Sequence, residues 1–192
     1  MLDLKNYKII LGSNSPRRKE ILTSMGISFS INAANIDEKV PKDISAYNYA
    51  EFLAIQKCDY LRPNLKTNEI LITADTTVLI DNQILNKPNN YIEAGIMLKK
   101  ISDNSHSVIT GVCISSTNKK ITFTCETEVK FKKLSNQEIE FYINKYQPLD
   151  KAGSYGIQEW IGLIGVEEIK GSYTNVVGLP SSKLYNELNK FI

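Results

Sequence analysis

The chain has few of the residues from which covalent or metal cross-links are made. It contains three cysteines, Cys58, Cys113 and Cys125, which are odd in number, widely spaced and without a C-x-x-C pair. This pattern predicts neither a disulfide framework nor a structural zinc site, and it favours a reducing compartment such as the cytoplasm. His106 is the only histidine, which excludes a metal site built from several histidines. We expect it to be a hydrogen-bonded residue at the start of a strand.

Long apolar runs and an excess of one charge are also missing. No run approaches the ~18 apolar residues of a membrane-spanning helix. The first residues include Asp3 and no apolar segment of a signal peptide, so we expect no membrane association. The net charge of +2 is too small to indicate nucleic-acid binding. Neither G-x-x-x-x-G-K-[ST] nor G-x-G-x-x-G occurs, which excludes a P-loop and a dinucleotide fingerprint.

The stretch around residues 8–20 is the first to carry a chemical signal. Lys8–Leu11 is predicted to be a buried strand, and a polar turn, Gly12–Ser15, follows it. The serine at the end of this turn is expected to cap a helix that starts at Pro16 and closes at Gly26. Arg17-Arg18-Lys19 oppose the helix dipole, and a bound polyanion would relieve this conflict. The alternative is a solvated basic face, but the context after a strand favours a phosphate site.

Acidic and basic residues later in the chain allow two interpretations each. The strand Ile70–Thr77 is expected to end in Asp75, placed either to hold Mg²⁺ or activate water or merely to cap a turn. Lys57 lies late on a helix predicted over 47–61. Its ammonium group either interacts favourably with the dipole at the C-terminal end of that helix or points toward phosphates. Asp37-Glu38 is either a solvated loop, which local sequence favours, or a source of ligands for a hard cation.

The remaining elements follow from periodicity and caps. Two segments that contain pairs of glycines, 150–158 and 171–180, imply a close approach of backbone to another segment or to a ligand. The predicted elements are a strand over 27–32, a hairpin of 78–80 with 83–85, a helix from Asn90 to Ile101, strands Ser105–Ser116 and Lys120–Lys133, a helix from a Ser135–Glu138 capping box to Asn144, and a final helix capped by Ser181.

Together these stretches resemble the Maf family of nucleoside triphosphate pyrophosphatases. The matching segments are LGSNSPRRKEIL, NIDEKVP, ITADTTVLIDNQILNKP, HSVITGV, DKAGSYGIQ and IKGSYTNVVGLP, which span nearly the whole chain in the family's order. The resemblance implies a single domain over 1–192 and a homodimer, which is the usual state in the family. It also implies an α/β fold like that of inosine triphosphate pyrophosphatases, with an elongated mixed sheet, flanking helices and a central cleft between two lobes.

The resemblance also implies a reaction and a set of site residues. Family members hydrolyse a nucleoside triphosphate between the α and β phosphates, give the monophosphate and pyrophosphate, and need Mg²⁺ or Mn²⁺. The matching positions are Asp75, Lys57 and Lys87 as catalytic residues; Ser13, Arg17, Arg18, Thr76 and Gln158 as substrate-binding residues; and Asp75 and Glu38 as metal ligands. The combination of Arg17, Thr76 and Gln158 is similar to the branch that acts on dTTP and UTP.

Three departures and one alternative remain. Gln147 stands where the family commonly has a glutamate before the proline. Gly12 stands where the family usually has alanine, and Glu159 stands where a glycine is usual, directly after Gln158, so that base selectivity is the property most exposed to this change. The alternative function is a nucleotide-sensing or nucleic-acid-binding regulator of cell division with little or no turnover. A pure binder has no need of the carboxylate of Asp75 beside a polyanion, which favours the enzyme.

Overall fold

The computed structural model describes residues 2–41 and 43–192, and its strands form a mixed sheet. The strands are β1 (Lys8–Leu11), β2 (Phe29–Ile31), β3 (Glu69–Ile80), β4 (Gln83–Leu85), β5 (Ser105–Ser115), β6 (Lys120–Phe131) and β7 (Val166–Lys170). Their order is β2-β1-β3-β5-β6-β7, with β4 beside β3. β1 is parallel to β2 and to β3, whereas β4 is antiparallel to β3 and β7 to β6. The predicted α/β class with a mixed sheet is confirmed.

The helices flank this sheet, and the chain divides into two compact units. The helices are α1 (Pro16–Ser24), α2 (Tyr49–Leu61), α3 (Tyr91–Ile101), α4 (Asn136–Tyr146), α5 (Trp160–Gly165), α6 (Tyr173–Val177) and α7 (Ser181–Phe191), and short 3₁₀ turns lie at Ala46–Asn48, Arg62–Asn64, Pro148–Asp150 and Ala152–Ser154. The first unit comprises Met1–Asp75, Thr110–Cys125 and Gly178–Ile192, and the second comprises Thr76–Ile109 and Glu126–Val177.

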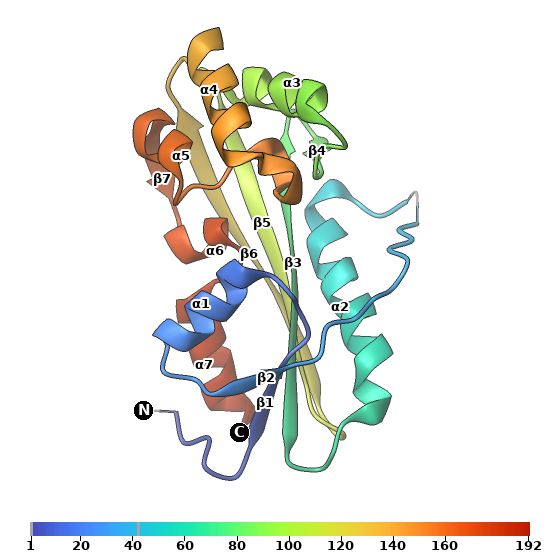
Figure 1. The fold of residues 1–192 in the computed structure, drawn as a ribbon. Helices are drawn as coiled ribbons and strands as arrows, with labels where there is room; N and C mark the ends of the chain where they lie inside the picture. Colours follow the sequence, from blue (N-terminus) through green and yellow to red (C-terminus); the bar gives the residue numbers. More distant parts are fainter. Residues whose placement is uncertain (1, 42) are drawn as a thin grey trace. The chain divides into compact units, whose positions relative to one another are not determined.

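The first unit buries apolar side chains on both faces of its strands. On β1, Ile9 packs in a cluster with Leu22 of α1 and Leu184 of α7, whereas the next residue, Ile10, packs with Ala54 of α2. Because successive residues of a strand point to opposite faces, α1 and α7 cover one face and α2 covers the other (Figure 1). This arrangement brings the N-terminal turn of α1 and the last turns of α2 to the same strands.

The second unit has its own core, in which α3, α4 and α5 pack on the strands. His106, in β5, is 3% exposed and its Nε2 lies 2.7 Å from the hydroxyl of Tyr155. The rings of Phe131 and Tyr155 meet edge to face, with centroids 5.1 Å apart. The expectation of a hydrogen-bonded histidine near a strand start is confirmed.

Most predicted elements are present, two local predictions are wrong, and one is confirmed only in part. β3 does not end at Asp75 but continues to Ile80, because the threonines after the aspartate are β-branched and extend the strand. Ser15 occupies the predicted N-cap position before Pro16, but its side chain makes no capping hydrogen bond. Ser181 is the first residue of α7, after Pro180, and not its cap. By contrast, the capping box of Ser135 is confirmed.

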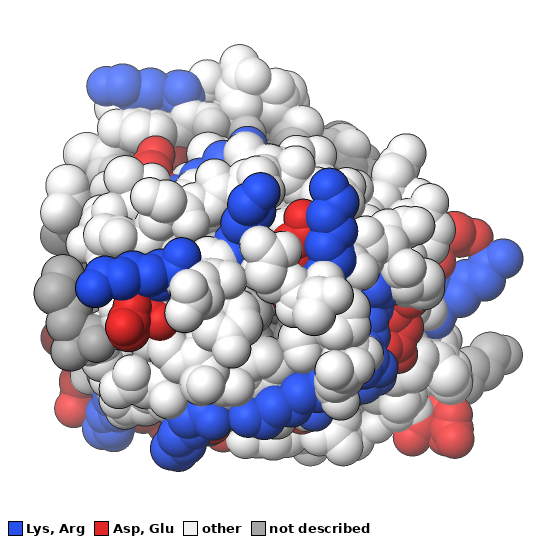
Figure 2. Space-filling model, turned by 90° about the horizontal axis from the view of Figure 1, so that it is seen from below, with Lys and Arg blue, Asp and Glu red and all other residues white. Residues whose placement is uncertain are grey.

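Charges of both signs share the surface in Figure 2, where Lys and Arg side chains lie among Asp and Glu side chains. Lys120 and Asp59, for example, form an ion pair at 2.7 Å. The chain has 23 basic and 21 acidic residues, so neither sign dominates its charge. Among the described residues, no helix has the length and apolar character needed to cross a bilayer.

Candidate active site

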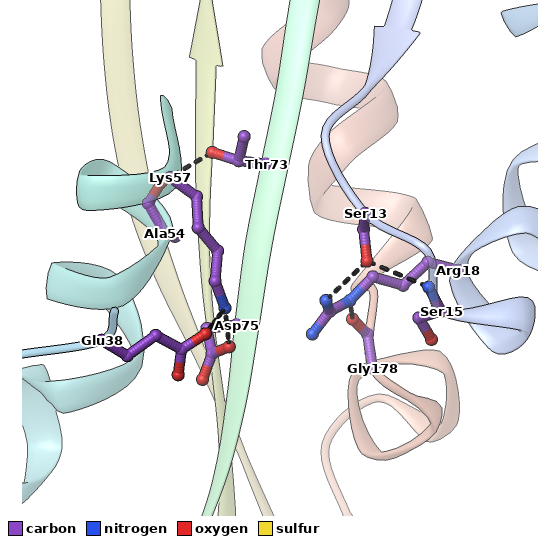
Figure 3. Close-up of polar contacts among 9 residues, drawn as sticks. All are labelled: Ser13, Ser15, Arg18, Glu38, Ala54, Lys57, Thr73, Asp75 and Gly178. Carbon is purple, nitrogen blue, oxygen red and sulfur yellow. Dashed lines mark hydrogen bonds and ion pairs between the residues drawn. The ribbon is translucent and has the colours of Figure 1, made fainter. Parts of the chain in front are cut away.

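Three predicted site residues meet in the first unit, around the ammonium group of Lys57. Its Nζ lies 2.5 Å from Oδ1 of Asp75 and 2.8 Å from Oε1 of Glu38. Figure 3 shows Lys57 reaching from α2 to both carboxylates, one from β3 and the other from the loop before α2. The side chains of Lys57 and Asp75 are 12% and 17% exposed. Lys57 thus lies in a charged cluster with two carboxylates, and its role toward phosphates stays a prediction.

The position of Lys57 follows from how α2 rests on the sheet. The buried hydroxyl of Thr73 donates a hydrogen bond of 2.7 Å to the carbonyl of Ala54, within the helix and one turn before Lys57. Gly111 of β5 lies against the backbone of α2, since a Cβ there would come within 2.3 Å of Glu51 Cα. Only glycine permits this approach. The helix is thus held close to β3, and Lys57 reaches Asp75 two residues beyond Thr73.

Asp75 lies mid-strand, yet just past the end of a parallel pairing. The register of β1 on β3 runs from Lys8 opposite Glu69 to Leu11 opposite Ile72, and the amide of Gly12 still donates to the carbonyl of Ile72 at 2.8 Å. Beyond that point the β1 chain turns away into the loop before α1. The rule that ligands gather where parallel strands end thus applies to the end of β1 rather than to the end of β3.

The loop before α1 is organised by the hydroxyl of Ser13, which is 9% exposed. Its Oγ accepts hydrogen bonds from the amide of Ser15 at 3.2 Å and from Nη1 of Arg18 at 3.1 Å. The Nε of Arg18 donates to the carbonyl of Gly178 at 2.9 Å (Figure 3). Arg18 therefore fastens the loop to the segment that leads into α7, while Arg17 is half-buried beside it in the first turn.

Burial and the nearby carboxylates act in opposite directions on Arg18. Desolvation lowers the pKa of its guanidinium, the charge of Arg17 lowers it further, and the carboxylates of Asp75 and Glu38 offset only part of this decrease. Guanidinium stays protonated in proteins, so it keeps a positive charge within the field of the two carboxylates. The loop, Lys57 and the acidic pair thus form a site of alternating charge, which suits a phosphate group accompanied by a cation.

Gly12 fits this loop for a steric reason. A Cβ at position 12 would lie 2.5 Å from Cγ2 of Thr73, which is closer than carbon atoms approach. The methyl group of Thr73, whose hydroxyl holds α2, occupies the space that a side chain at Gly12 would need. Glycine in place of the family's usual alanine at position 12 thus leaves room for the methyl group of Thr73.

The other predicted site residues belong to the second unit. Thr76 is half-buried in β3, Lys87 is exposed after β4, and Gln158 is exposed in a turn before α5. Glu159, after Gln158, turns its carboxylate toward the hydroxyl of Tyr142 and the ammonium of Lys151.

The residues predicted to bind metal have suitable chemistry for a hard cation. In the described part of the chain there is no cluster of three or more His, Cys, Asp or Glu residues arranged to hold an ion. Asp75 and Glu38 nevertheless both bring a carboxylate oxygen to one point, the ammonium of Lys57. Mg²⁺ commonly uses one or two carboxylates, waters and substrate phosphates, so this pair fits it.

Sequence reasoning missed several residues that shape these sites. Thr73 and Gly178 act through contacts with residues far away in the chain, and a buried threonine in a strand carries no local signal. Tyr142 lies on the buried side of α4, where an aromatic residue is usually core. Lys151 stood in a glycine-containing segment already singled out, but nothing in the sequence indicated its partner.

The chain is similar to known proteins. The family model described as "Maf-like protein" matches residues 8–191. The dTTP/UTP pyrophosphatase of Bacteroides thetaiotaomicron is 46% identical over 98% of each chain, and that of Parabacteroides distasonis is 48% identical over 98% of each chain. Among solved structures, the Staphylococcus aureus Ham1 protein is similar at 16% identity and a TM-score of 0.49, over 94% of this chain and 99% of that one.

The match to the family model spans nearly all of the sequence, and the relatives exceed 40% identity over nearly their full length. The chain therefore belongs to the Maf-like protein family.

Proposed function

We propose that this chain is a nucleoside triphosphate pyrophosphatase that hydrolyses dTTP and UTP to the monophosphate and pyrophosphate. The observation that carries the proposal is the Lys57 ammonium held between Asp75 and Glu38, in the same unit as the Ser13–Arg18 loop. The names of the relatives, dTTP/UTP pyrophosphatases, support the choice of substrate.

The cationic side chains would neutralise the triphosphate. Phosphoryl transfer asks a protein mainly to position the reactants and to stabilise charge. We assign this task to Arg17, Arg18, Lys57 and Lys87. Ser13 would complete the phosphate loop. Thr76 and Gln158 would contact the nucleoside, in keeping with the dTTP/UTP branch that they resemble.

The carboxylate of Asp75 would act on the attacking water. Its Oδ1 pairs with Lys57, and we propose that Oδ2 accepts a proton as the water oxygen bonds to the α-phosphorus and the bond to the bridging oxygen of pyrophosphate breaks. Lys57 then has two functions: it holds the carboxylate in place and it offsets charge on the phosphate oxygens.

Asp75 and Glu38 would hold a divalent cation, Mg²⁺ or Mn²⁺. When bound, such an ion withdraws charge from phosphate oxygens. Asp75 would then serve as ligand and base at once, and Asp75→Asn separates the two roles. If this variant keeps its affinity for Mn²⁺ and loses turnover, the base role stands; if both are lost together, the ligand role is sufficient.

The wider assignment follows the family. We propose that residues 1–192 act as one Maf-like domain, that two chains form a homodimer, and that the protein works in the cytoplasm. The buried thiols of Cys58 and Cys113, which are free, suit a reducing compartment. The alternative of a regulator without turnover is not favoured, because the relatives bear the names of enzymes.

A turnover panel tests the proposal. The purified protein is incubated with Mg²⁺ and each common and modified nucleoside triphosphate, and Asp75→Asn serves as the control. We expect monophosphate and pyrophosphate from dTTP and UTP and none from the control. Diphosphate with phosphate, or no turnover by the folded wild type, would contradict the proposal.

A further inference from the structure

A partly buried network of hydrogen bonds holds the turn that carries Gln158. The hydroxyl of Tyr142 accepts a hydrogen bond of 3.0 Å from the amide of Gly156 and donates one to Oε2 of Glu159. The other oxygen, Oε1, lies 3.0 Å from Nζ of Lys151. Tyr142 is 0% and Lys151 8% exposed. All of these residues belong to the second unit.

The protonation states of Tyr142, Glu159 and Lys151 are compatible with the hydrogen bonds between them. Burial, together with the Glu159 carboxylate, raises the pKa of the Tyr142 hydroxyl, so the hydroxyl keeps the proton that it donates. The ammonium of Lys151 also pairs with Asp150 at 2.7 Å. A buried lysine needs such partners, and the two carboxylates supply them. Each of these polar groups therefore has a partner of matching chemistry.

Two glycines fit the turn tightly to its surroundings. A Cβ at Gly156 would lie 2.7 Å from Cδ of Glu159, and a Cβ at Gly162 of α5 would lie 1.9 Å from the carbonyl oxygen of Ile157. The turn itself is closed by a hydrogen bond of 3.0 Å from the amide of Glu159 to the carbonyl of Gly156. Gly156, Ile157 and Glu159 are thus fixed, and Gln158 between them is exposed.

We propose that Tyr142, Glu159 and Lys151 are positioning residues that fix the orientation of Gln158 and thereby the selectivity for the base. This inference rests on the proposed function, in which Gln158 contacts the nucleoside. A primary amide has a donor and an acceptor side by side, which matches the N3–H and O4 of uracil and thymine. Discrimination by such a pair depends on a firmly held backbone, and the Tyr142 network holds it.

Kinetics of Tyr142→Phe and Gln158→Ala, singly and combined, test the inference. We expect Tyr142→Phe to lower the ratio of kcat/KM for dTTP over dCTP about tenfold, the size of effect typical of an unpaired buried hydrogen-bonding group, mainly through KM for dTTP. Tyr146→Phe is the matched control, because its ring stacks on Tyr142 and its hydroxyl lies outside the network; its ratio should equal that of the wild type.

The combined variant reports whether the network acts through Gln158. In the Gln158→Ala background, Tyr142→Phe should have no further effect on the ratio. An unchanged ratio in Tyr142→Phe alone, or effects that simply multiply in the combined variant, would overturn the inference. If Tyr142→Phe fails to fold, Glu159→Gln and Glu159→Met replace it. Neither variant offers both an acceptor to the Tyr142 hydroxyl and a carboxylate to the Lys151 ammonium, so both should lower the ratio; an unchanged ratio in both would contradict the account.

Hydrogen exchange separates this inference from the proposed function. In the protein without nucleotide, Tyr142→Phe should reduce the protection of the Gly156 amide at least tenfold, and Tyr146→Phe should not. Unchanged protection of the Gly156 amide would refute the positioning role of the Tyr142 network, whether or not the enzyme turns over dTTP. Failure of the wild type to hydrolyse dTTP, with protection behaving as expected, would instead refute the proposed function.

Discussion

Protonation of His106 gives a quantitative test of the packing in the second unit. Burial lowers the pKa of this imidazole from 6.5 to about 4, because a charged ring would lose its hydration between Phe131 and Tyr155. In the unfolded chain the ring takes up a proton near pH 6.5, whereas in the folded chain it does so only near pH 4. The unfolded state therefore binds more protons between these values, so stability is complete above this range and falls as the pH decreases through it.

The expected size follows from the two values. The free energy of unfolding should fall by about 2 kcal/mol between pH 7 and pH 5, and by about 3 kcal/mol once the pH is below both values. Urea denaturation at several pH values measures this change. His106→Gln is the comparison, and the difference between the two proteins removes the contribution of carboxylates that titrate nearby.

The single histidine also allows a direct measurement, since its ring gives one set of NMR signals. We expect these signals to titrate near pH 4 in the folded protein. A midpoint near 6.5, or the same pH dependence of stability in His106→Gln as in the wild type, would refute the reasoning about burial.

Three further predictions concern the first unit. Gly12→Ala should lower the free energy of unfolding by about 1–3 kcal/mol, because its methyl group overlaps that of Thr73; Thr73→Ser in the same chain should restore most of the loss in thermal denaturation, and no recovery would contradict the steric account. Lys57→Met should lower kcat about 100-fold and tighten Mn²⁺ binding in calorimetry, since it removes the cation between Asp75 and Glu38; weaker Mn²⁺ binding would argue against a cation site there. EDTA should abolish dTTP turnover and Mg²⁺ restore it, whereas full activity in EDTA would exclude the metal requirement.

Sequence periodicity was sufficient for most helices and strands, because the signals lie within a few residues. The capping box of Ser135 and the positive φ of Gly26 at the end of α1 are of this kind. The extension of β3 past Asp75 was missed, because a polar residue after an apolar run resembles a strand end. The β-branched threonines after Asp75 favour a strand, and the pairing of Val78–Ile80 with β4 carries it to its end.

The site depended more on the family resemblance than on local patterns. Glu38, Lys57 and Asp75 come from a loop, a helix and a strand, and no periodicity predicts that they meet. Local sequence favoured a solvated loop for Glu38, and the ion pair with Lys57 became visible only in the fold. The direction of the Glu159 side chain could not be predicted from the sequence either, because its partners, Tyr142 and Lys151, lie 17 and 8 positions earlier in the chain.

The most direct test of the proposed reaction is to find which phosphorus atom of dTTP the water attacks. Hydrolysis of dTTP in ¹⁸O-labelled water, followed by mass spectrometry of both products, shows which phosphorus the water attacks. If Asp75 directs water to the α-phosphorus, one ¹⁸O atom appears in the monophosphate and none in pyrophosphate. Label in pyrophosphate, or labelled phosphate with a diphosphate product, would contradict the account.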